Sequence, residues 1–246
     1  MKVLITGANK GIGFGIAEAL GKEGCEILVG ARSEKRGQEA VEKLISQGIT
    51  ASFIKIDLND FETIHKAAAE VEELDLLVNN AGIPDAAKEG RPDLDHTKTV
   101  FDYTTEDLRT TMEVNFLGTH EMIQTFLPKL AEKGKIVNMS VPIQPNNFWG
   151  PLAYQTSKAA LNIMMMTYAL AFKNAKSQQQ IFGILPGAVA TDLNGAEVGG
   201  LGGFVKSIED AGKLVAKFAL DSQNHNGQMI QFDGKILTDY EVQLRG

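Results

Sequence analysis

A tyrosine and a lysine four positions apart are the first residues in this sequence that could do chemistry. Tyr154 and Lys158 open a stretch with helical periodicity, so their side chains are predicted to share one helix face. A free tyrosine has a pKa of about 10 and exchanges protons poorly at neutral pH. A neighbouring ammonium group favours the phenolate and lowers that pKa. The pair by itself is more typical of a surface pairing on a helix, so a lysine-tuned proton donor or acceptor is predicted only together with further residues.

Ser140 is the natural companion of this pair, because it ends an apolar run 14 residues before Tyr154. In a parallel sheet, the carboxyl end of such a strand lies beside the start of the next helix. A hydroxyl group there can hydrogen-bond a substrate oxygen while Tyr154 passes the proton. The three residues together predict acid–base chemistry on an oxygen-bearing small molecule.

Apolar runs alternate with helix-period stretches from end to end, and this alternation predicts the elements that position these side chains. The runs are short and rich in Val, Ile and Leu, as in strands buried on both faces of a parallel sheet. The repetition is typical of an open, doubly wound α/β sheet flanked by helices, of Rossmann type. Strands are predicted over 2–6, 26–31, 52–57, 74–78, 135–140, 180–186 and 228–232, and helices over 13–23, 35–47, 60–73, 105–132, 153–173 and 208–219.

No linker or internal repeat divides the chain, so residues 1–246 are predicted to form one domain with about seven strands. Two longer segments, 84–104 and 187–206, interrupt the alternation, and both follow the carboxyl end of a predicted strand. Such loops are usually functional, and they lie on the side where these sheets bind ligands. They are expected to shape a substrate site, although their side chains do not identify the substrate.

Composition excludes several classes of protein. The chain has 24 Lys and Arg against 31 Asp and Glu, a net charge of −7, which argues against a nucleic-acid partner. One cysteine excludes an intrachain disulfide, and four scattered histidines show no metal-ligand spacing. No apolar run approaches a membrane span and the first residues do not resemble a signal peptide, so a cytoplasmic protein is expected.

Glycine is the one unusual component, with 25 residues, and three of them form a motif. Gly7, Gly11 and Gly13 follow the first predicted strand with G-x3-G-x-G spacing and lead into a helix. Gly7 suits a tight turn, Gly11 admits a pyrophosphate, and Gly13 lets helix and strand pack closely. The helix N-terminus presents unpaired N–H groups to the phosphates. This context predicts a dinucleotide site.

The end of the second strand indicates which dinucleotide binds. An NAD site usually has an acidic residue there, on the ribose 2′-hydroxyl. This strand instead ends with Arg32 and Ser33, and Lys10 adds a second cation within the glycine turn. Both cations suit a 2′-phosphate, so NADP(H) is predicted in preference to NAD(H). Glu34 is the nearest acid, and it would reverse this prediction if the strand extended that far.

Taken together and in this order, these motifs resemble the short-chain dehydrogenase/reductases of standard length. The resemblance covers nearly the whole chain, and the glycine turn with Ala31-Arg32 is most similar to the NADPH-dependent carbonyl reductases. The residues that match the family's cofactor segments are Gly7, Asn9, Lys10, Gly11, Ile12, Gly13, Arg32, Asp57, Leu58, Asn80, Ala81, Gly82, Tyr154, Lys158, Pro186, Gly187, Val189 and Thr191.

The resemblance implies a mechanism as well as a fold. It implies that NADPH reduces a ketone, aldehyde or quinone to an alcohol, with Tyr154 as general acid and Ser140 positioning the oxygen. Lys158 would hold the nicotinamide ribose and lower the pKa of Tyr154. Asn115 would complete a catalytic tetrad by anchoring a water that links Lys158 to solvent. The reverse reaction, oxidation of an alcohol, uses the same groups.

Assembly follows from one difference within the family. Some carbonyl reductases carry a long insertion before the tyrosine, associated with a monomeric state, and this sequence lacks it. The helices predicted over 105–132 and 153–173 are therefore expected to form the family's four-helix contact, giving a homodimer or homotetramer. Val141 and Pro142 depart from the Ser or Gly common after the serine, which leaves the geometry of that loop open.

Two other functions remain open at this point. One is an NAD-linked alcohol or sugar dehydrogenase, which relative affinities for NADPH and NADH would distinguish. The other is a nucleotide-sensing regulator that keeps the fold without catalysis. Such a protein need not retain Tyr154, Lys158 and Ser140, so their joint presence favours the enzyme.

Overall fold

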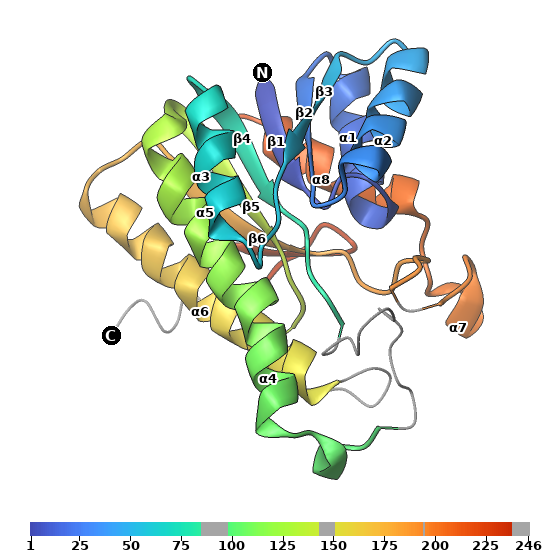
Figure 1. Cartoon of the computed structure of the whole chain (residues 1–246). Coiled ribbons are helices and arrows are strands. Elements are labelled where there is room, and N and C mark those ends of the chain that lie inside the picture. The colour runs from blue at the N-terminus through green and yellow to red at the C-terminus, as the bar shows by residue number, and fades with distance from the viewer. Residues whose placement is uncertain (85–97, 143–150, 194, 238–246) are drawn as a thin grey trace.

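The computed structural model describes residues 1–84, 98–142, 151–193 and 195–237. Its strands join one sheet in the order β3-β2-β1-β4-β5-β6-β7-β8 (Figure 1), parallel except for the antiparallel pairing of β7 with β8. The strands are β1 (Lys2–Thr6), β2 (Glu26–Ala31), β3 (Ala51–Lys55), β4 (Leu74–Asn79), β5 (Leu130–Met139), β6 (Gln180–Leu185), β7 (Met229–Gln231) and β8 (Ile236–Leu237).

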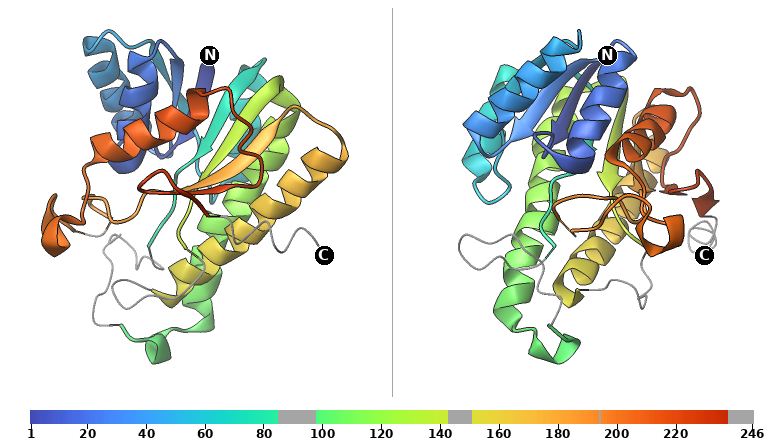
Figure 2. Two further views of the ribbon diagram at one scale, coloured as in Figure 1. Left: turned by 180° about the vertical axis from the view of Figure 1, so that it is seen from behind. Right: turned by 90° about the vertical axis from the view of Figure 1, so that its right-hand side faces the viewer.

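Helices cover both faces of this sheet, as the predicted doubly wound, Rossmann-type fold requires (Figures 1 and 2). The α-helices are α1 (Gly11–Lys22), α2 (Glu34–Ser46), α3 (Phe61–Glu70), α4 (Thr105–Met112), α5 (Thr119–Phe126), α6 (Leu152–Asn174), α7 (Gly200–Gly203) and α8 (Ile208–Leu220). Side chains of α1, α2 and α8 share one core cluster with the sheet, and those of α3, α5 and α6 share the other.

Alternation along the central strands explains how one sheet supports two cores. In β4, Leu77 belongs to one core cluster and Val78 to the other, and neither side chain is exposed to solvent. Successive strand residues point to opposite faces, so a strand covered on both sides needs apolar residues at every position. The prediction of strands buried on both faces is confirmed for the central strands such as β4, whereas the edge strand β3 has Ser52 and Lys55 exposed.

The helix predicted over 105–132 is wrong in its continuity and its end. The segment contains α4, a π-helical turn η2 (Glu113–Gly118), α5 and a 3-10 turn η3 (Leu127–Lys129), and β5 begins at Leu130. Pro128 lies in η3, where its ring and missing N–H prevent a regular helix from continuing. The prediction also missed the first half of β5, because exposed Glu132 and Lys133 interrupt its apolar pattern.

The ends of the sheet and its loops differ in smaller ways from expectation. The sheet has an eighth strand, β8, whose two residues are too few for any periodicity to reveal. Segment 187–206 contains the short helix α7. Of segment 84–104, residues 85–97 lie outside the described residues, and its end forms a 3-10 turn, η1 (Val100–Asp102). The assignment of residues 1–246 to one domain stays a prediction.

Candidate active site at the carboxyl edge of the sheet

The predicted site residues follow the carboxyl ends of neighbouring strands, and the parallel sheet brings those ends to one edge. The glycine turn follows β1, residues 80–82 follow β4, Ser140 follows β5, and residues 186–191 follow β6. The chain crosses over in opposite directions from β1 to β2 and from β3 to β4, so the neighbours β1 and β4 mark the topological switch point. Ligands bind in the crevice at such a point in open α/β sheets.

Thr6 and Asn80 fasten the glycine turn to the end of β4. The Thr6 hydroxyl accepts hydrogen bonds from the backbone N–H groups of Asn80 and Ala81, both at 3.0 Å. The Asn80 side chain donates to the Thr6 carbonyl oxygen at 2.9 Å. A Cβ at Gly13 would lie 2.5 Å from both the Asn80 side-chain nitrogen and the Gly7 carbonyl oxygen. Only glycine at position 13 allows this close packing.

The N-terminus of α1 has the features of an anion site. Lys10 precedes the helix and makes no capping hydrogen bond through its side chain, and the first turn contains no acidic residue. In contrast, α2, α4 and α8 are each capped by a Ser or Thr hydroxyl and have acidic residues in the first turn. A helix start without side-chain caps leaves backbone N–H groups and the positive end of the dipole for a phosphate. The glycine turn therefore fits the pyrophosphate of a dinucleotide.

The two basic residues predicted to select the nucleotide lie near this turn and differ in their contacts. Strand β2 ends at Ala31, and Arg32 follows it with an exposed side chain. Glu34 begins α2, so the strand does not extend far enough for this acid to take the place of Arg32. Lys10 forms an exposed ion pair with Asp192 at 3.0 Å, which joins the glycine turn to the segment after β6.

Asp57 and Leu58 follow β3 and differ in orientation. One carboxylate oxygen of Asp57 accepts a hydrogen bond from the Asn59 N–H at 3.0 Å. Leu58 is buried in the core, where a Cβ at Gly118 would lie 2.6 Å from its own Cβ. The Leu58 side chain therefore packs against the π-helical turn, and only its backbone can face a nucleotide.

Asn115 connects three elements at the centre of the site. Its side-chain oxygen accepts from the Ile83 N–H at 2.8 Å, and its side-chain nitrogen donates to the Ile83 carbonyl oxygen at 2.9 Å and to the Ser157 hydroxyl at 3.0 Å. Ser157 in turn donates to the Tyr154 carbonyl oxygen at 2.7 Å. Asn115 lies in the π-helical turn η2, a distortion frequent at functional sites. The fully buried Asn115 thus joins the end of β4 to the start of α6.

Tyr154 and Lys158 lie on one face of α6, as predicted, with the Lys158 nitrogen 5.7 Å from the centre of the Tyr154 ring. The Lys158 ammonium donates to the Met139 carbonyl oxygen at 2.8 Å. Burial lowers the pKa of Lys158 to about 8 and raises the pKa of Tyr154 above its usual value. The expected lowering of the Tyr154 pKa is therefore not produced by the described protein groups, because desolvation dominates.

Ser140 and the segment after β6 complete the edge. The Ser140 N–H donates to the Ile184 carbonyl oxygen at 2.9 Å, which continues the β5–β6 pairing to the serine. Pro186 and Gly187 follow β6, Val189 pairs with Lys206 across the base of the following loop, and the Thr191 methyl group lies 3.6 Å from a Cβ built on Gly11. The structure thus brings the segments of both predicted sets to one edge.

Two polar residues of this region escaped the sequence analysis. Ser157 links Asn115 to the backbone of Tyr154, and Asn162 accepts a hydrogen bond from Ser140. Both are buried on α6, one residue before Lys158 and four residues after it. A polar residue one turn beyond Lys158 in a largely apolar helix was the available signal for Asn162.

Comparison with known proteins identifies the family. The chain matches the family model of short chain dehydrogenase over residues 1–199. The chain belongs to the short-chain dehydrogenase family. It is 31% identical to the short-chain dehydrogenase anuI of Penicillium roqueforti (strain FM164), over 96% of this chain and 93% of that protein. It is 36% identical to carbonyl reductase (NADPH) 1 of Mus musculus, but this match covers 56% of this chain and only 47% of the mouse protein.

Two solved structures of related proteins have the same architecture. A dehydrogenase/reductase from Sinorhizobium meliloti 1021 superposes with a TM-score of 0.81 at 26% identity, covering 94% of this chain and 92% of that one. The NADPH-bound carbonyl reductase from chicken fatty liver gives a TM-score of 0.79 at 24% identity, covering 96% and 98%. The second likeness shows the fold alone.

Two features are absent from the described ranges of this short-chain dehydrogenase. No helix there is both long and apolar enough to cross a lipid bilayer. No group of three or more His, Cys, Asp or Glu side chains gathers there into a place for a metal ion.

Proposed function

We propose that this short-chain dehydrogenase uses NADPH to reduce the carbonyl group of a ketone, aldehyde or quinone to an alcohol. The observation that supports this most is the approach of Tyr154, Lys158 and Asn115 to one another beside a glycine turn that fits a pyrophosphate. A Cβ at Gly82 would lie 3.0 Å from the Asn115 side-chain oxygen and 3.8 Å from the Lys158 nitrogen. The acid–base residues thus lie next to the segments proposed to bind the nucleotide.

The cofactor would be held by the backbone of the glycine turn, with Arg32 and Lys10 at the 2′-phosphate. When bound, NADPH supplies the hydride that reduces the carbonyl carbon. Asp57, the backbone of Leu58, residues 80–82 and residues 186–191 would line the rest of the cofactor site. Solved relatives described as NADP complexes, such as a short chain dehydrogenase from Burkholderia cenocepacia J2315 with 26% identity and a TM-score of 0.78, support this choice.

Proton transfer is assigned to the residues of α6 and their neighbours. Tyr154 donates its proton to the carbonyl oxygen, and Ser140 positions that oxygen. Lys158 orients the cofactor, and its ammonium group lies 5.7 Å from the centre of the Tyr154 ring. The backbone carbonyl oxygen of Asn115 accepts a hydrogen bond from the Thr119 hydroxyl group at 3.0 Å. Asn115 would anchor the relay water that links Lys158 to solvent.

Tyr154→Phe tests the assigned reaction. We expect kcat/KM for NADPH-linked reduction of a panel of carbonyl compounds to fall about a thousandfold, because the proton donor is lost. The Kd for NADPH, followed by its fluorescence, should change little. Tyr168→Phe, which removes a hydroxyl from the same helix at its Gln124 contact, is the matched control and should remain active. Full activity of Tyr154→Phe would refute the proposal.

Arg32→Ala tests the cofactor preference and separates this function from an NAD-linked alcohol or sugar dehydrogenase. Removing one charge-assisted contact should raise the Kd for NADPH about tenfold and leave the Kd for NADH unchanged. Lys43→Ala removes an exposed cation from the last turn of α2 and should change neither constant. Equal wild-type affinities for NADPH and NADH would contradict the assigned preference.

The assembly proposed for this chain is a homodimer or homotetramer in the cytoplasm. Ile163 and Leu170 project from α6 with 56% and 41% of their area exposed, and Leu117 is 42% exposed on η2. A groove between α5 and α6 lies next to these residues, lined by His120, Met164, Thr167, Tyr168 and Ala171. A shared apolar face of this kind supports pairing of the α5–α6 surfaces, and sedimentation equilibrium of the full chain measures it.

A further inference from the structure

A buried hydrogen bond fixes the proton of Ser140. The Ser140 hydroxyl donates to the side-chain oxygen of Asn162 at 2.5 Å, and the two residues are 3% and 1% exposed. Asn162 lies one helical turn beyond Lys158 and two turns beyond Tyr154 on α6. The i, i+4, i+8 spacing gives these three side chains a common helix face. Asn162 therefore contacts Ser140 directly but is not itself one of the residues proposed to touch the substrate.

The direction of this hydrogen bond follows from the second contact of Asn162. Its side-chain nitrogen donates to the Val141 carbonyl oxygen at 3.0 Å. A carbonyl oxygen only accepts, so the amide cannot be turned the other way. The Asn162 oxygen must then face Ser140, and this oxygen also only accepts. The single hydroxyl proton of Ser140 consequently points at Asn162, and the serine oxygen presents lone pairs elsewhere.

The backbone around Ser140 is held as firmly as its side chain. The Ser140 N–H is bonded to the Ile184 carbonyl oxygen, and the following carbonyl, that of Val141, is bonded to Asn162. The Cβ of Ser140 is thus fixed from two sides, and rotation about the Cβ–Oγ bond is the movement left to the hydroxyl proton. To donate to a reacting oxygen, Ser140 must turn its proton away from Asn162.

We infer that Asn162 is a positioning residue for carbonyl reduction: it holds the Ser140 hydroxyl in place, and it is the hydrogen-bond acceptor that a reacting oxygen replaces when Ser140 donates a hydrogen bond to that oxygen. This inference rests on the proposed function of the site. Asn162 acts through the Ser140 hydroxyl and through the adjoining Val141 carbonyl oxygen, which it holds beside Ser140, and it therefore affects the rate of the chemical step. It should not affect binding of NADPH, whose proposed contacts lie elsewhere on the edge. Substitution of a buried asparagine needed only for folding would lower the stability of the protein without a loss of kcat that depends on Ser140.

A double-mutant cycle separates these roles. Asn162→Leu should lower kcat about tenfold in the wild-type background, the size typical of one broken buried contact. In the Ser140→Ala background, which lacks the hydroxyl, the same substitution should change kcat less than about twofold. The Kd for NADPH should be unchanged in all four proteins. An equal loss of kcat in both backgrounds would overturn the inference.

Asn226→Leu is the matched control, because Asn226 also makes one accepted and one donated hydrogen bond near α6. Its side-chain oxygen accepts from the Ile181 N–H at 3.1 Å, and its nitrogen donates to the Ala169 carbonyl oxygen at 2.8 Å. Asn226→Leu should lower the melting temperature and leave kcat unchanged. A loss of kcat equal to that of Asn162→Leu would assign both effects to folding.

Asn162→Ala provides a second variant with less steric risk, and it should show the same dependence on Ser140. If neither Asn162 variant folds while Asn226→Leu does, Asn162 is a structural residue and the inference fails. If wild type and Asn226→Leu both bind NADPH but reduce none of the carbonyl compounds, the proposed function itself fails. The two failures are therefore distinguishable.

Discussion

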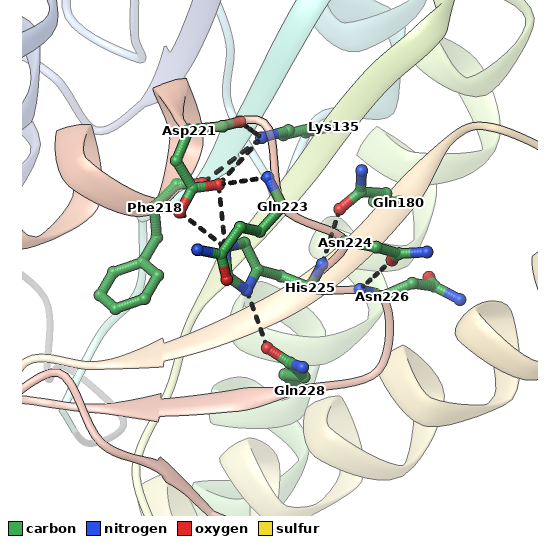
Figure 3. Close-up of polar contacts among 9 residues, drawn as sticks. All are labelled: Lys135, Gln180, Phe218, Asp221, Gln223, Asn224, His225, Asn226 and Gln228. Carbon is green, nitrogen blue, oxygen red and sulfur yellow. Dashed lines mark hydrogen bonds and ion pairs between the residues drawn. The ribbon is translucent and has the colours of Figure 1, made fainter.

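Two buried lysines bond backbone carbonyl oxygens at opposite edges of the sheet, and they have opposite surroundings. At the carboxyl end, Lys158 of α6 donates to the Met139 carbonyl oxygen of β5. At the amino end of the sheet, where β6 begins, Lys135 of β5 pairs with Gln180. Lys135 donates to the Asp221 carbonyl oxygen at 2.7 Å and lies 3.9 Å from the Asp221 carboxylate (Figure 3). The two lysines are 3% and 8% exposed, but Lys158 is enclosed more deeply by the protein, so they differ in depth of burial as well as in counter-charge.

Burial lowers the pKa of both lysines, but among the described residues a compensating carboxylate acts only on Lys135. The Asp221 carboxylate partly restores the pKa of Lys135, whereas burial alone acts on Lys158 and lowers its pKa to about 8. A lysine with such a pKa exchanges its proton near physiological pH. A buried lysine without a counter-charge is therefore suited to a functional site, whereas a lysine paired with a carboxylate is suited to a structural role.

The surroundings of Asp221 support the structural role of the amino-end cluster. His225 is buried, with one ring nitrogen 2.9 Å from the Asp221 carboxylate and the other 2.8 Å from the Gln228 side-chain oxygen (Figure 3). Its ring lies between Phe182 and Phe218, with centroid distances of 5.5 and 5.2 Å. These contacts anchor the segment between α8 and β7 on the end of the sheet away from the proposed site.

The largest expected effect is on catalysis at the carboxyl end. Lys158→Met should lower kcat/KM for carbonyl reduction about a thousandfold, because the proposed cofactor contact and the cation beside Tyr154 are both lost. Its free energy of unfolding at neutral pH should stay equal or rise, since an uncompensated buried ammonium is removed. Steady-state kinetics and urea unfolding measure the two quantities. Lys173→Met, at the exposed end of α6, should match wild type, and an active Lys158→Met would break the comparison.

The second largest expected effect is a difference between wild type and Lys158→Met in how the free energy of unfolding depends on pH. The pKa of Lys158 is about 8 in the folded protein and 10.5 in its ordinary state. Between these values the unfolded chain binds more protons, so the free energy of unfolding rises with pH, and the burial penalty is complete only below the folded pKa. The difference between wild type and Lys158→Met should therefore shift by about 3 kcal/mol in favour of wild type between pH 7 and 10.

The free energy of unfolding of Lys135→Met, measured over the same pH range, tests whether the counter-charge reduces this shift. Asp221 opposes the effect of burial on Lys135, so the shift relative to wild type should be clearly smaller over the same pH range. Equal shifts for Lys158→Met and Lys135→Met would mean that the counter-charge does not distinguish the two lysines.

The smallest expected effect is the loss of stability at the amino end. Lys135→Met leaves the Asp221 carboxylate, which is 28% exposed, without its lysine. The free energy of unfolding should fall by about 2 kcal/mol, less than for a fully buried pair. Both kcat and KM should remain at wild-type values. Lys133→Met, at an exposed position of the same strand, is the control for the loss of a cation, and a large loss of kcat in Lys135→Met would place this cluster in the mechanism.

The sequence predicted the elements and the edge at which the candidate site lies, because both depend on local patterns. Buried parallel strands need continuous apolar runs, and their carboxyl ends must share one edge. The glycine turn after β1 and the Tyr154–Lys158 spacing therefore indicated the site. Local pattern failed where it was weak: the exposed residues in the first half of β5, the break at Pro128, and the two residues of β8.

The sequence by itself determined which chemical groups this protein has and along which edge they lie. The tertiary structure decided their state. Ser140 meets Asn162 across 22 positions, Lys135 meets Asp221 across 86, and Lys10 meets Asp192 across 182. Burial and counter-charges, which set the protonation of Lys158 and the direction of the Ser140 proton, arise only when such distant segments pack together. No periodicity along the chain encodes them, because desolvation depends on everything that surrounds a side chain.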